Sequence, residues 1–417
     1  MYRWRFFASG VIIVLLLGAV FVGGYTLGEH RVQGAEADAP GFSVFWQVRD
    51  LLNRDFMGEA PPSQAQVYGA THGLVASYND PYTIFVEPTP RQFERDELRG
   101  HFGGIGATLG RNDAGDLLLT VMPDRPAARA GVRDGDILIA VDAQAIPPEM
   151  SVQDVVALIR GEVGTEVALT LRRTGEPAPL SITIVRERIE MPSVEWRVLD
   201  QAHHIGYVRI SIFGERTNQE LSQGLTGLAA AGVEKTVLDL RGNGGGLLDA
   251  AVDIASQFLQ DGKVLWEVKR GGQERFYPVE AVRSPAQAWK IAVLVDAGTA
   301  SASEIVAGAL RDGGRAVLIG EKTYGKGSVQ EVHELPDGSS LHVTVARWLT
   351  PARRQIDQTG LEPDIVVNIS AADRDAGRDP QLARAQAWLR AQVSSQFFGE
   401  SLASHPGLWL SLERIRP

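Results

Sequence analysis

The chain of 417 residues contains no cysteine, which excludes thiol catalysis and disulfide bonds. Its eight histidines include no His-Glu-x-x-His pattern, and we expect His203 and His204 to face opposite sides of a strand as structural residues. The sequence therefore predicts no metal and no cofactor. Positive charge is also scarce: 41 Lys and Arg against 51 Asp and Glu give a net charge of −10. This balance argues against nucleic acid as a partner.

Long apolar runs are absent except at the N-terminus, where Phe6 to Leu27 is nearly uninterrupted. A helix of this length can span ~30 Å of hydrocarbon, and Arg3 and Arg5 before it are expected to stay cytoplasmic. Residues 1–28 are therefore predicted to be a transmembrane anchor, single-pass in the inner membrane, or a signal segment. Cleavage near Ala35-Glu36-Ala37 would instead release the remainder as a secreted or periplasmic protein.

The rest of the chain is long enough for two or three domains, and 44% apolar residues support real cores. Residues 29–41 are rich in Gly, Ala and acids and are predicted to be a linker. Residues 42–98 are predicted to be helical, because apolar residues recur every three to four positions. Asn79-Asp80-Pro81-Tyr82-Thr83 is expected to close the second helix.

Residues 99–188 combine several features in an order that resembles a PDZ domain. The glycine-rich run Gly103-Gly104-Ile105-Gly106 is followed by a short helix and turn at Pro126–Val132, a helix at Val152–Ile159 and an alternating strand at Val167–Leu171. The resemblance implies that Gly103, Gly104, Ile105 and Gly106 bind substrate, with their amides forming a nest for a terminal carboxylate. The alternative is a β-rich spacer without a ligand.

From residue 189 to 370 strands and helices alternate, which predicts an α/β fold: a mixed core with a sheet and crossover helices. The predicted strands are Ile205–Ile210, Thr236–Leu240, Ile291–Val295 and Ala316–Ile319. Residues 371–417 are predicted to form a C-terminal helical tail, in which no motif is readable from Val393 onward.

Three residues carry the clearest chemistry: Ser301, Lys326 and Gln330. Ser301 follows the predicted strand Ile291–Val295, and apolar residues recur at helical spacing from Ile305 onward. Ser301 is thus expected on a strand-to-helix turn with its hydroxyl exposed. A serine hydroxyl needs a base, and a lysine can be that base if burial and the absence of a nearby carboxylate lower its pKa. Gln330 could orient the lysine by hydrogen bond without adding charge.

These motifs also allow other interpretations. The run from Gly320 to Lys326 nearly matches a phosphate-binding loop, but Gly327 stands where the required Ser or Thr should be. Ser303 is an alternative nucleophile, although a first-turn position in the helix is favoured for it. Glu304 is interpreted as a first-turn acid stabilised by the helix dipole rather than as a catalytic group.

Attack by Ser301 on a carbonyl would create an oxyanion that needs two hydrogen-bond donors. One candidate is the amide of Ala302 at the helix start. The other lies in the glycine-rich loop from Gly242 to Gly246, which ends a strand and opens a helix. A phosphate nest is the alternative interpretation of this loop.

The run from Val295 to Ile305 and the run from Gly325 to Gln330 together resemble the carboxyl-terminal processing proteases, also called tail-specific proteases. The resemblance implies that Ser301 is the nucleophile, Lys326 the base and Gln330 a supporting residue. It also implies that Gly245, with Gly246 as the close alternative, completes the oxyanion hole with Ala302. Gly242 and Gly244 depart from the family's usual Asn and Pro, so the loop is expected to be less rigid before substrate binds.

We therefore expect an extracytoplasmic serine endopeptidase that captures protein C-terminal tails through its PDZ-like domain and cleaves them by a Ser-Lys mechanism. Its core would be residues 189–370. The rival hypothesis is a non-catalytic PDZ scaffold for envelope proteins, which would have no need of Ser301, Lys326 and Gln330 together. Expected partners are protein or peptide substrates, the membrane, and a second copy or a regulatory protein. The sequence leaves open the substrate, the cleavage preference and the oligomeric state.

Overall fold

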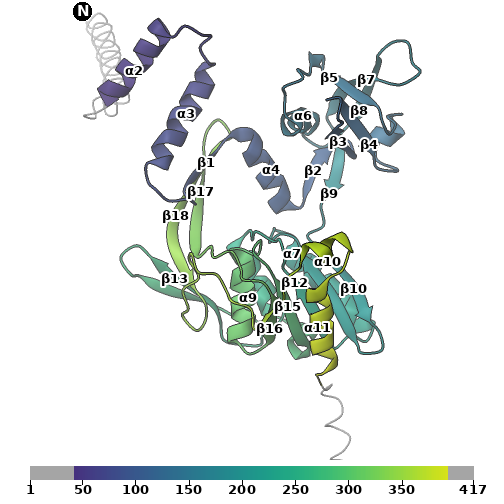
Figure 1. Cartoon of the computed structure of the whole chain (residues 1–417), viewed down its shortest axis with the longest axis vertical. Coiled ribbons are helices and arrows are strands. Elements are labelled where there is room, and N and C mark those ends of the chain that lie inside the picture. The colour runs from purple at the N-terminus through teal and green to yellow at the C-terminus, as the bar shows by residue number, and fades with distance from the viewer. Residues whose placement is uncertain (1–41, 393–417) are drawn as a thin grey trace, which may run out of the picture. The chain divides into compact units, whose positions relative to one another are not determined.

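The computed structural model describes residues 42–392 (Figure 1). These divide into two compact units, the first ending at Thr71 and the second beginning at His72. The first unit contains α2 (Phe42–Asp55) and the start of α3 (Ser63–Ala76), and neither helix has a buried residue. The predicted anchor at 1–28, the linker at 29–41 and the stretch from Val393 lie outside the described residues. Within residues 42–392, no helix is both long and apolar enough to cross a membrane.

The second unit is built on a six-stranded sheet in the order β10-β11-β12-β15-β16-β19. The edge strand β10 is antiparallel to β11, and the remaining neighbours are parallel. The predicted strands of the core all lie in this sheet. Its strands are β10 (Val194–Asp200), β11 (Ile205–Ile210), β12 (Lys235–Asp239), β15 (Lys290–Val295), β16 (Ala316–Gly320) and β19 (Ile365–Val366).

Successive side chains of each strand point to opposite faces of the sheet, so both faces present apolar side chains. Helices cover both faces. Val208, Leu238 and Val293 belong to one core cluster with apolar residues of α7, α8 and α9. Their neighbours Val237 and Leu294 belong to a second cluster, which includes residues of α11. The predicted α/β core is thereby confirmed. The helices of the core are α7 (Thr217–Ala230), α8 (Leu248–Ser256), η1 (Pro285–Ala288), α9 (Ala302–Asp312), α10 (Ala371–Asp375) and α11 (Pro380–Arg390).

A second sheet has the order β1-β18-β13-β14, with β17 also paired to β18. Its strand β1 corrects the prediction that residues 42–98 are all helical. Ile84 and Val86 pair with His342 and Ser340 of β18, so a partner far along the chain decides this segment. The elements are β1 (Ile84–Val86), α4 (Pro88–Arg99), β13 (Lys263–Lys269), β14 (Glu274–Pro278), β17 (Ser328–Glu334) and β18 (Ser340–Leu349).

The PDZ-like region has its own sheet, ordered β3-β4-β5-β7-β8 with β6 paired to β5, and its own apolar core. A separate ribbon of β2 and β9 begins and ends the region. The predicted helices and the alternating strand are α5, α6 and β7. The elements are β2 (His101–Gly104), β3 (Ala107–Arg111), β4 (Leu117–Val121), α5 (Pro126–Arg129), β5 (Ile137–Val141), β6 (Gln144–Ala145), α6 (Val152–Ile159), β7 (Glu166–Arg172), β8 (Leu180–Val185) and β9 (Glu187–Glu190).

His203 and His204 lie in the turn before β11, not on a strand as predicted. His203 contacts the Asp200 carboxylate at 2.9 Å, and His204 contacts the Gly232 carbonyl at 2.7 Å. A turn is favoured here because His204 has a φ of 56°, a region that strands do not use.

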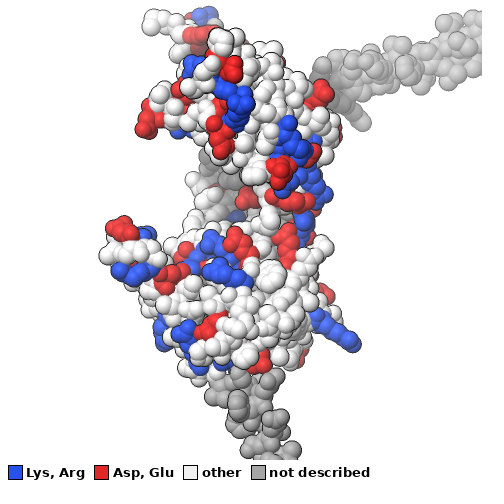
Figure 2. Space-filling view, turned by 90° about the vertical axis from the view of Figure 1, so that its right-hand side faces the viewer, with Lys and Arg blue, Asp and Glu red and all other residues white. Residues whose placement is uncertain are grey.

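On the face drawn in Figure 2, acidic and basic side chains are interspersed over the described surface.

Candidate active site

Ser301 lies between β15 and α9, on the strand-to-helix turn that its sequence context predicts. Its backbone is strained, with φ 55° and ψ −118°, and such a conformation costs ~1–3 kcal/mol unless neighbours hold it. The Asn243 carbonyl holds the turn, because it accepts a hydrogen bond from the Ala300 amide at 3.0 Å and from the buried Ser303 hydroxyl at 2.9 Å. Ser303 is thus a structural first-turn residue, and the Ser301 side chain is only half-buried.

Glu304 connects the turn at Ser301 to the loop that carries Lys326. Its fully buried carboxylate accepts the backbone amides of Ser301 and Lys326 on Oε2, both at 2.9 Å. On Oε1 it accepts the Gly325 amide at 2.8 Å and the Thr323 hydroxyl at 2.5 Å. Burial raises the pKa of Glu304, although the hydrogen bonds act in the opposite direction. From the sequence, Glu304 is expected only to be a first-turn acid stabilised by the helix dipole. In the structure its carboxylate also holds two chain segments together.

The Lys326 side chain is half-buried, and burial lowers the pKa of its amine from the ordinary value. The carboxylates of Glu94 and Asp80 oppose this shift of the Lys326 pKa. Burial, rather than an absence of carboxylates, is therefore what lowers the pKa of Lys326, because Glu94 of α4 and Asp80 before β1 act against it. The ring of Tyr82 lies 5.3 Å from Lys326 Nζ and covers one side of the amine. A partly desolvated amine with a lowered pKa can act as a base.

A cavity of about 490 Å³ brings the predicted catalytic residues together. Ser301, Ala302, Lys326, Gln330 and Gly245 all line it. Among the described residues, no hydrogen bond joins Ser301 Oγ to Lys326 Nζ. In enzymes without bound substrate, catalytic hydrogen bonds are often long and tighten only in the complex. Apolar side chains complete the wall: Leu98, Ile212, Leu247, Leu248, Ile305, Val329, Val332 and Trp348.

Gln330 faces this cavity with its amide already engaged. Its Nε2 donates to the Ser328 hydroxyl at 2.8 Å and to the Thr344 hydroxyl at 3.2 Å. The Lys326 loop is held from another direction, because the Trp348 indole donates to the Lys326 carbonyl at 3.0 Å. An orienting role of Gln330 on the Lys326 amine stays a prediction.

The glycine loop packs directly against Ser301. A Cβ added at Gly245 would lie only 2.8 Å from Ser301 Cβ, and Gly245 has a φ of 109°, so only glycine fits. The Gly245 amide, the predicted oxyanion donor, donates to the Asn243 side-chain oxygen at 2.9 Å. To bind an oxyanion it must share or leave this bond. The choice between Gly245 and Gly246 therefore stays open, while the loop itself is well placed.

The PDZ-like region presents the predicted carboxylate loop at the end of β2. The Ile105 carbonyl accepts the Ala127 amide at 2.8 Å, and the Gly106 carbonyl accepts the Met122 amide at 2.9 Å. Among the described residues, the amides of Ile105 and Gly106 donate to no other group. A Cβ at Gly103 would overlap the Gly161 carbonyl, which explains glycine there. The loop has the free amides that a carboxylate nest needs.

Helix α4 carries residues that contact both regions. Glu94, Glu97 and Leu98 line the cavity of Ser301. On another side of the helix, the Asp96 carboxylate pairs with Arg160 at 3.1 Å, just after α6 of the PDZ-like region. The spacing along α4 therefore places one group of side chains on the Ser301 cavity and another on the PDZ-like region.

Several residues of the site were not identified from the sequence as functional. The sequence marks Tyr82 only as part of a helix stop and does not single out Glu94, Asn243 or Trp348. No local pattern marks them, because each acts through a partner that is distant in the chain. The exception is Asn243, whose place inside a glycine-rich loop could have signalled a residue that holds the loop in shape.

Comparisons with known proteins agree with this geometry. Residues 204–367 match the model of peptidase family S41, and residues 117–173 match that of the PDZ domain. The fold, the site and these matches define a serine peptidase with a PDZ domain.

Named relatives make the assignment more specific. The carboxy-terminal processing protease CtpA of Bacillus subtilis (strain 168) is 32% identical over 362 residues, covering 85% of this chain and 76% of the relative. A carboxyl-terminal-processing protease of Picosynechococcus sp. is 34% identical over 321 residues, covering 76% and 77%. The solved structure of a photosystem II D1 C-terminal processing protease is 33% identical over 78% of this chain and 86% of that one, with a TM-score of 0.45. The chain belongs to the carboxyl-terminal processing proteases of peptidase family S41.

Proposed function

We propose that this peptidase is an endopeptidase that uses Ser301 as nucleophile and Lys326 as general base to cleave proteins presented by their C-terminal tails. The observation that carries the proposal is the cavity in which Ser301, Lys326 and the Gly245 loop meet. A half-buried amine with a lowered pKa and a serine on a strained turn are the two groups that this chemistry requires.

In the proposed reaction, neutral Lys326 takes the proton of the Ser301 hydroxyl while Oγ attacks the substrate carbonyl carbon. The resulting oxyanion is stabilised by the Ala302 amide at the N-terminus of α9 and by an amide of the glycine loop. The Lys326 ammonium then gives its proton to the leaving amine, and the acyl-enzyme forms. Water, deprotonated by Lys326, attacks the ester, and the Lys326 ammonium returns this proton to Ser301 Oγ as the acid is released.

Glu304 holds Ser301 and Lys326 at a fixed separation by accepting their backbone amides. Gln330 is proposed to support Lys326 without adding a carboxylate to its surroundings. The apolar side chains of the cavity wall would bind uncharged side chains of the substrate near the scissile bond.

We propose that the PDZ-like region selects the substrate. A peptide would add as a strand, with its terminal carboxylate on the amides around Gly103, Gly104, Ile105 and Gly106. Support comes from the uncommitted amides of Ile105 and Gly106. In calorimetry, a peptide with a free apolar C-terminus should bind more tightly than its amidated form, and equal binding would reject this mode.

We also propose that residues 1–28 anchor the protein in the inner membrane with the catalytic region on the extracytoplasmic side. The support is the apolar run with Arg3 and Arg5 before it. Separately, α2 exposes apolar side chains such as Phe42, Trp46 and Leu52, which favours a further partner, either a second copy or a regulatory protein. Fractionation of cells making the full chain, compared with a form lacking residues 1–30, tests the anchor; a full chain in the cytosol would reject it.

The catalytic assignment is tested with a purified protein and a substrate with a free C-terminal tail. Ser301→Ala and Lys326→Ala should each abolish cleavage, and the double variant should be no worse, because the residues act as a unit. Lys322→Ala is the matched control, since Lys322 is in the same loop region but its side chain is 54% exposed. Cleavage by the Ser301→Ala protein would refute the assignment of Ser301 as nucleophile. If the parent protein cleaved none of the tail substrates, the scaffold hypothesis would be favoured.

A further inference from the structure

Arg241 stands at the root of the glycine loop, directly after β12 and before Gly242. Its guanidinium has five N–H donors. Two of them bind Asp239: Nε to Oδ1 at 2.9 Å and Nη2 to Oδ2 at 2.6 Å. The Asp239 carboxylate, which is fully buried, also accepts the Tyr207 hydroxyl at 2.8 Å.

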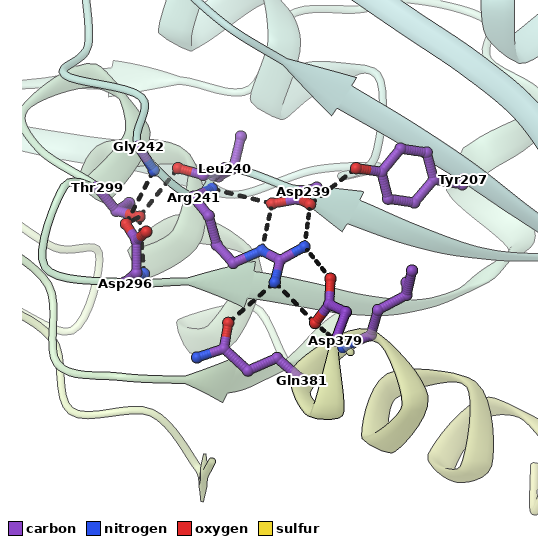
Figure 3. Close-up of polar contacts among 10 residues, drawn as sticks. Tyr207, Asp239, Leu240, Arg241, Gly242, Asp296, Thr299, Asp379 and Gln381 are labelled. Carbon is purple, nitrogen blue, oxygen red and sulfur yellow. Dashed lines mark hydrogen bonds and ion pairs between the residues drawn. The ribbon is translucent and has the colours of Figure 1, made fainter. Parts of the chain in front are cut away.

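The other three donors bind residues at the start of α11, as Figure 3 shows. Nη1 donates to Asp379 Oδ1 at 3.0 Å and to Gln381 Oε1 at 3.0 Å, and Nη2 donates to Asp379 Oδ2 at 2.8 Å. All five donors are thus satisfied. Burial lowers the pKa of Arg241, but its hydrogen bonds and ion pairs with Asp239 and Asp379 outweigh this and raise it.

Gln381 and Asp379 are themselves fixed. Gln381 is 1% exposed, and its Nε2 donates to the Val367 carbonyl at 2.7 Å. Asp379 is the N-cap of α11 and accepts the Leu382 amide at 2.9 Å. Arg241 is therefore held between two rigid elements, β12 on one side and α11 on the other.

The loop that follows Arg241 leads directly to the nucleophile. The Gly242 amide donates to the Asp296 carboxylate at 2.9 Å, and Thr299, two residues before Ser301, donates to the Leu240 carbonyl at 2.9 Å (Figure 3). One residue further, Asn243 binds the Ser301 turn through its carbonyl. Gly242 and Gly244 give the loop little stiffness of its own, so its shape depends on these attachments.

We propose that Asp379 and Gln381 are positioning residues for the oxyanion loop, acting through Arg241, so that the start of α11 is part of the catalytic apparatus. The proposal rests on the proposed function of Ser301 and of the glycine loop. Neither side chain lines the catalytic cavity. Their effect is on where the loop amides point when the oxyanion develops, and hence on the transition state rather than on bound substrate.

The test is steady-state kinetics of purified Asp379→Asn on a tail substrate. Asparagine is as good an N-cap as aspartate, so α11 keeps its cap while Arg241 loses a charged bidentate partner. We expect kcat to fall ~10-fold to 100-fold, less than the 10²–10³ typical of a deleted oxyanion donor, with KM within about twofold. Gln381→Met, which keeps the volume but removes the acceptor, should act in the same direction.

The matched control is Arg390→Gln. Arg390 anchors the other end of α11 through an ion pair with Asp200 at 2.8 Å and does not contact Arg241. It should leave kcat unchanged. An equal fall of kcat in Arg390→Gln and Asp379→Asn would show general docking of α11 and overturn the proposal.

Binding to an inactive background separates positioning from loss of folding. In the Ser301→Ala background, Asp379→Asn should leave the Kd for the tail substrate unchanged. In protein that keeps Ser301, a peptide aldehyde that forms a tetrahedral adduct with its Oγ should bind Asp379→Asn more weakly than the parent. Equal aldehyde affinity, or unchanged kcat in folded Asp379→Asn and Gln381→Met, would overturn the proposal alone. Turnover by Ser301→Ala would instead overturn the proposed function on which it rests.

Discussion

Replacing Glu304 with Gln perturbs the contact that joins the nucleophile turn to the lysine loop. The carboxylate accepts four hydrogen bonds, from the amides of Ser301, Lys326 and Gly325 and from the Thr323 hydroxyl. A carboxamide has one acceptor oxygen and one NH2 group, which cannot accept. The substitution is nearly isosteric, so its effect reports on hydrogen bonding and charge rather than on volume.

The orientation of the new amide can be worked out from the four partners. An NH2 in place of Oε2 would face two backbone amides, neither of which can turn around. In place of Oε1 it faces Thr323, whose hydroxyl can rotate to accept, and the Gly325 amide, which cannot. The second orientation is cheaper, but it leaves the buried Gly325 amide unsatisfied and takes the acceptor from the Thr323 hydroxyl, whose oxygen already accepts the Leu361 amide at 2.7 Å.

The expected cost follows from this count. An unsatisfied buried donor costs ~1–3 kcal/mol, and the bonds that remain lose their charge assistance. We expect Glu304→Gln to lower the free energy of unfolding by about 2–4 kcal/mol. The Gly325–Lys326 segment should also shift away from Ser301, and a displacement of 1 Å can cost ~10²-fold in rate.

Denaturant unfolding and cleavage kinetics measure the two effects separately. Glu321→Gln is the matched control: its carboxylate is half-buried and accepts the Ile369 amide at 3.2 Å, so the change should cost less than about 1 kcal/mol. If Glu304→Gln were as stable and as active as the parent, the inferred coupling of the two catalytic segments would be refuted.

Two further predictions concern Lys326 and the PDZ-like region. Because burial lowers the pKa of Lys326, kcat/KM should rise with pH through a pKa below the ordinary ~10.4, and Glu94→Gln, which removes an opposing carboxylate, should move this rise to lower pH. A pH–rate profile unchanged by Glu94→Gln would contradict the assignment. Gly103→Ala should weaken binding of a free-acid peptide, because the new methyl overlaps the Gly161 carbonyl, whereas Gly110→Ala enters open space and should not; equal affinities in calorimetry would count against it.

Much of the fold and the place of Ser301 on a strand-to-helix turn could be predicted from sequence because their signals are local. The strand Lys290–Val295, the strained turn at Ser301 and helix α9 follow one another without interruption, so pattern and chemistry coincide within a few residues. The same holds for the PDZ-like elements, whose short turns and alternating strand are set by neighbouring residues.

Other features depended on partners that no local pattern names. Residues Ile84–Val86 form a strand because they pair with β18, although the flanking segments are helical. The carboxylates that act on the Lys326 pKa could not be identified from its own segment for the same reason, since Glu94 and Asp80 come from a distant part of the chain. Which strands pair and which distant side chains come close depends on tertiary packing, and the spacing of apolar residues in the sequence carries no information about it.

The sequence by itself determined which groups can do chemistry: a serine on a strand-to-helix turn, a lysine in a glycine-flanked loop and a glycine-rich anion site. Only the tertiary structure decided how they are held. Glu304 spans two loops through their amides, and Arg241 joins the loop root to Asp379 across 138 positions of the chain. The physical reason is that a hydrogen bond depends on distance in space, and the fold alone brings such donors and acceptors within reach.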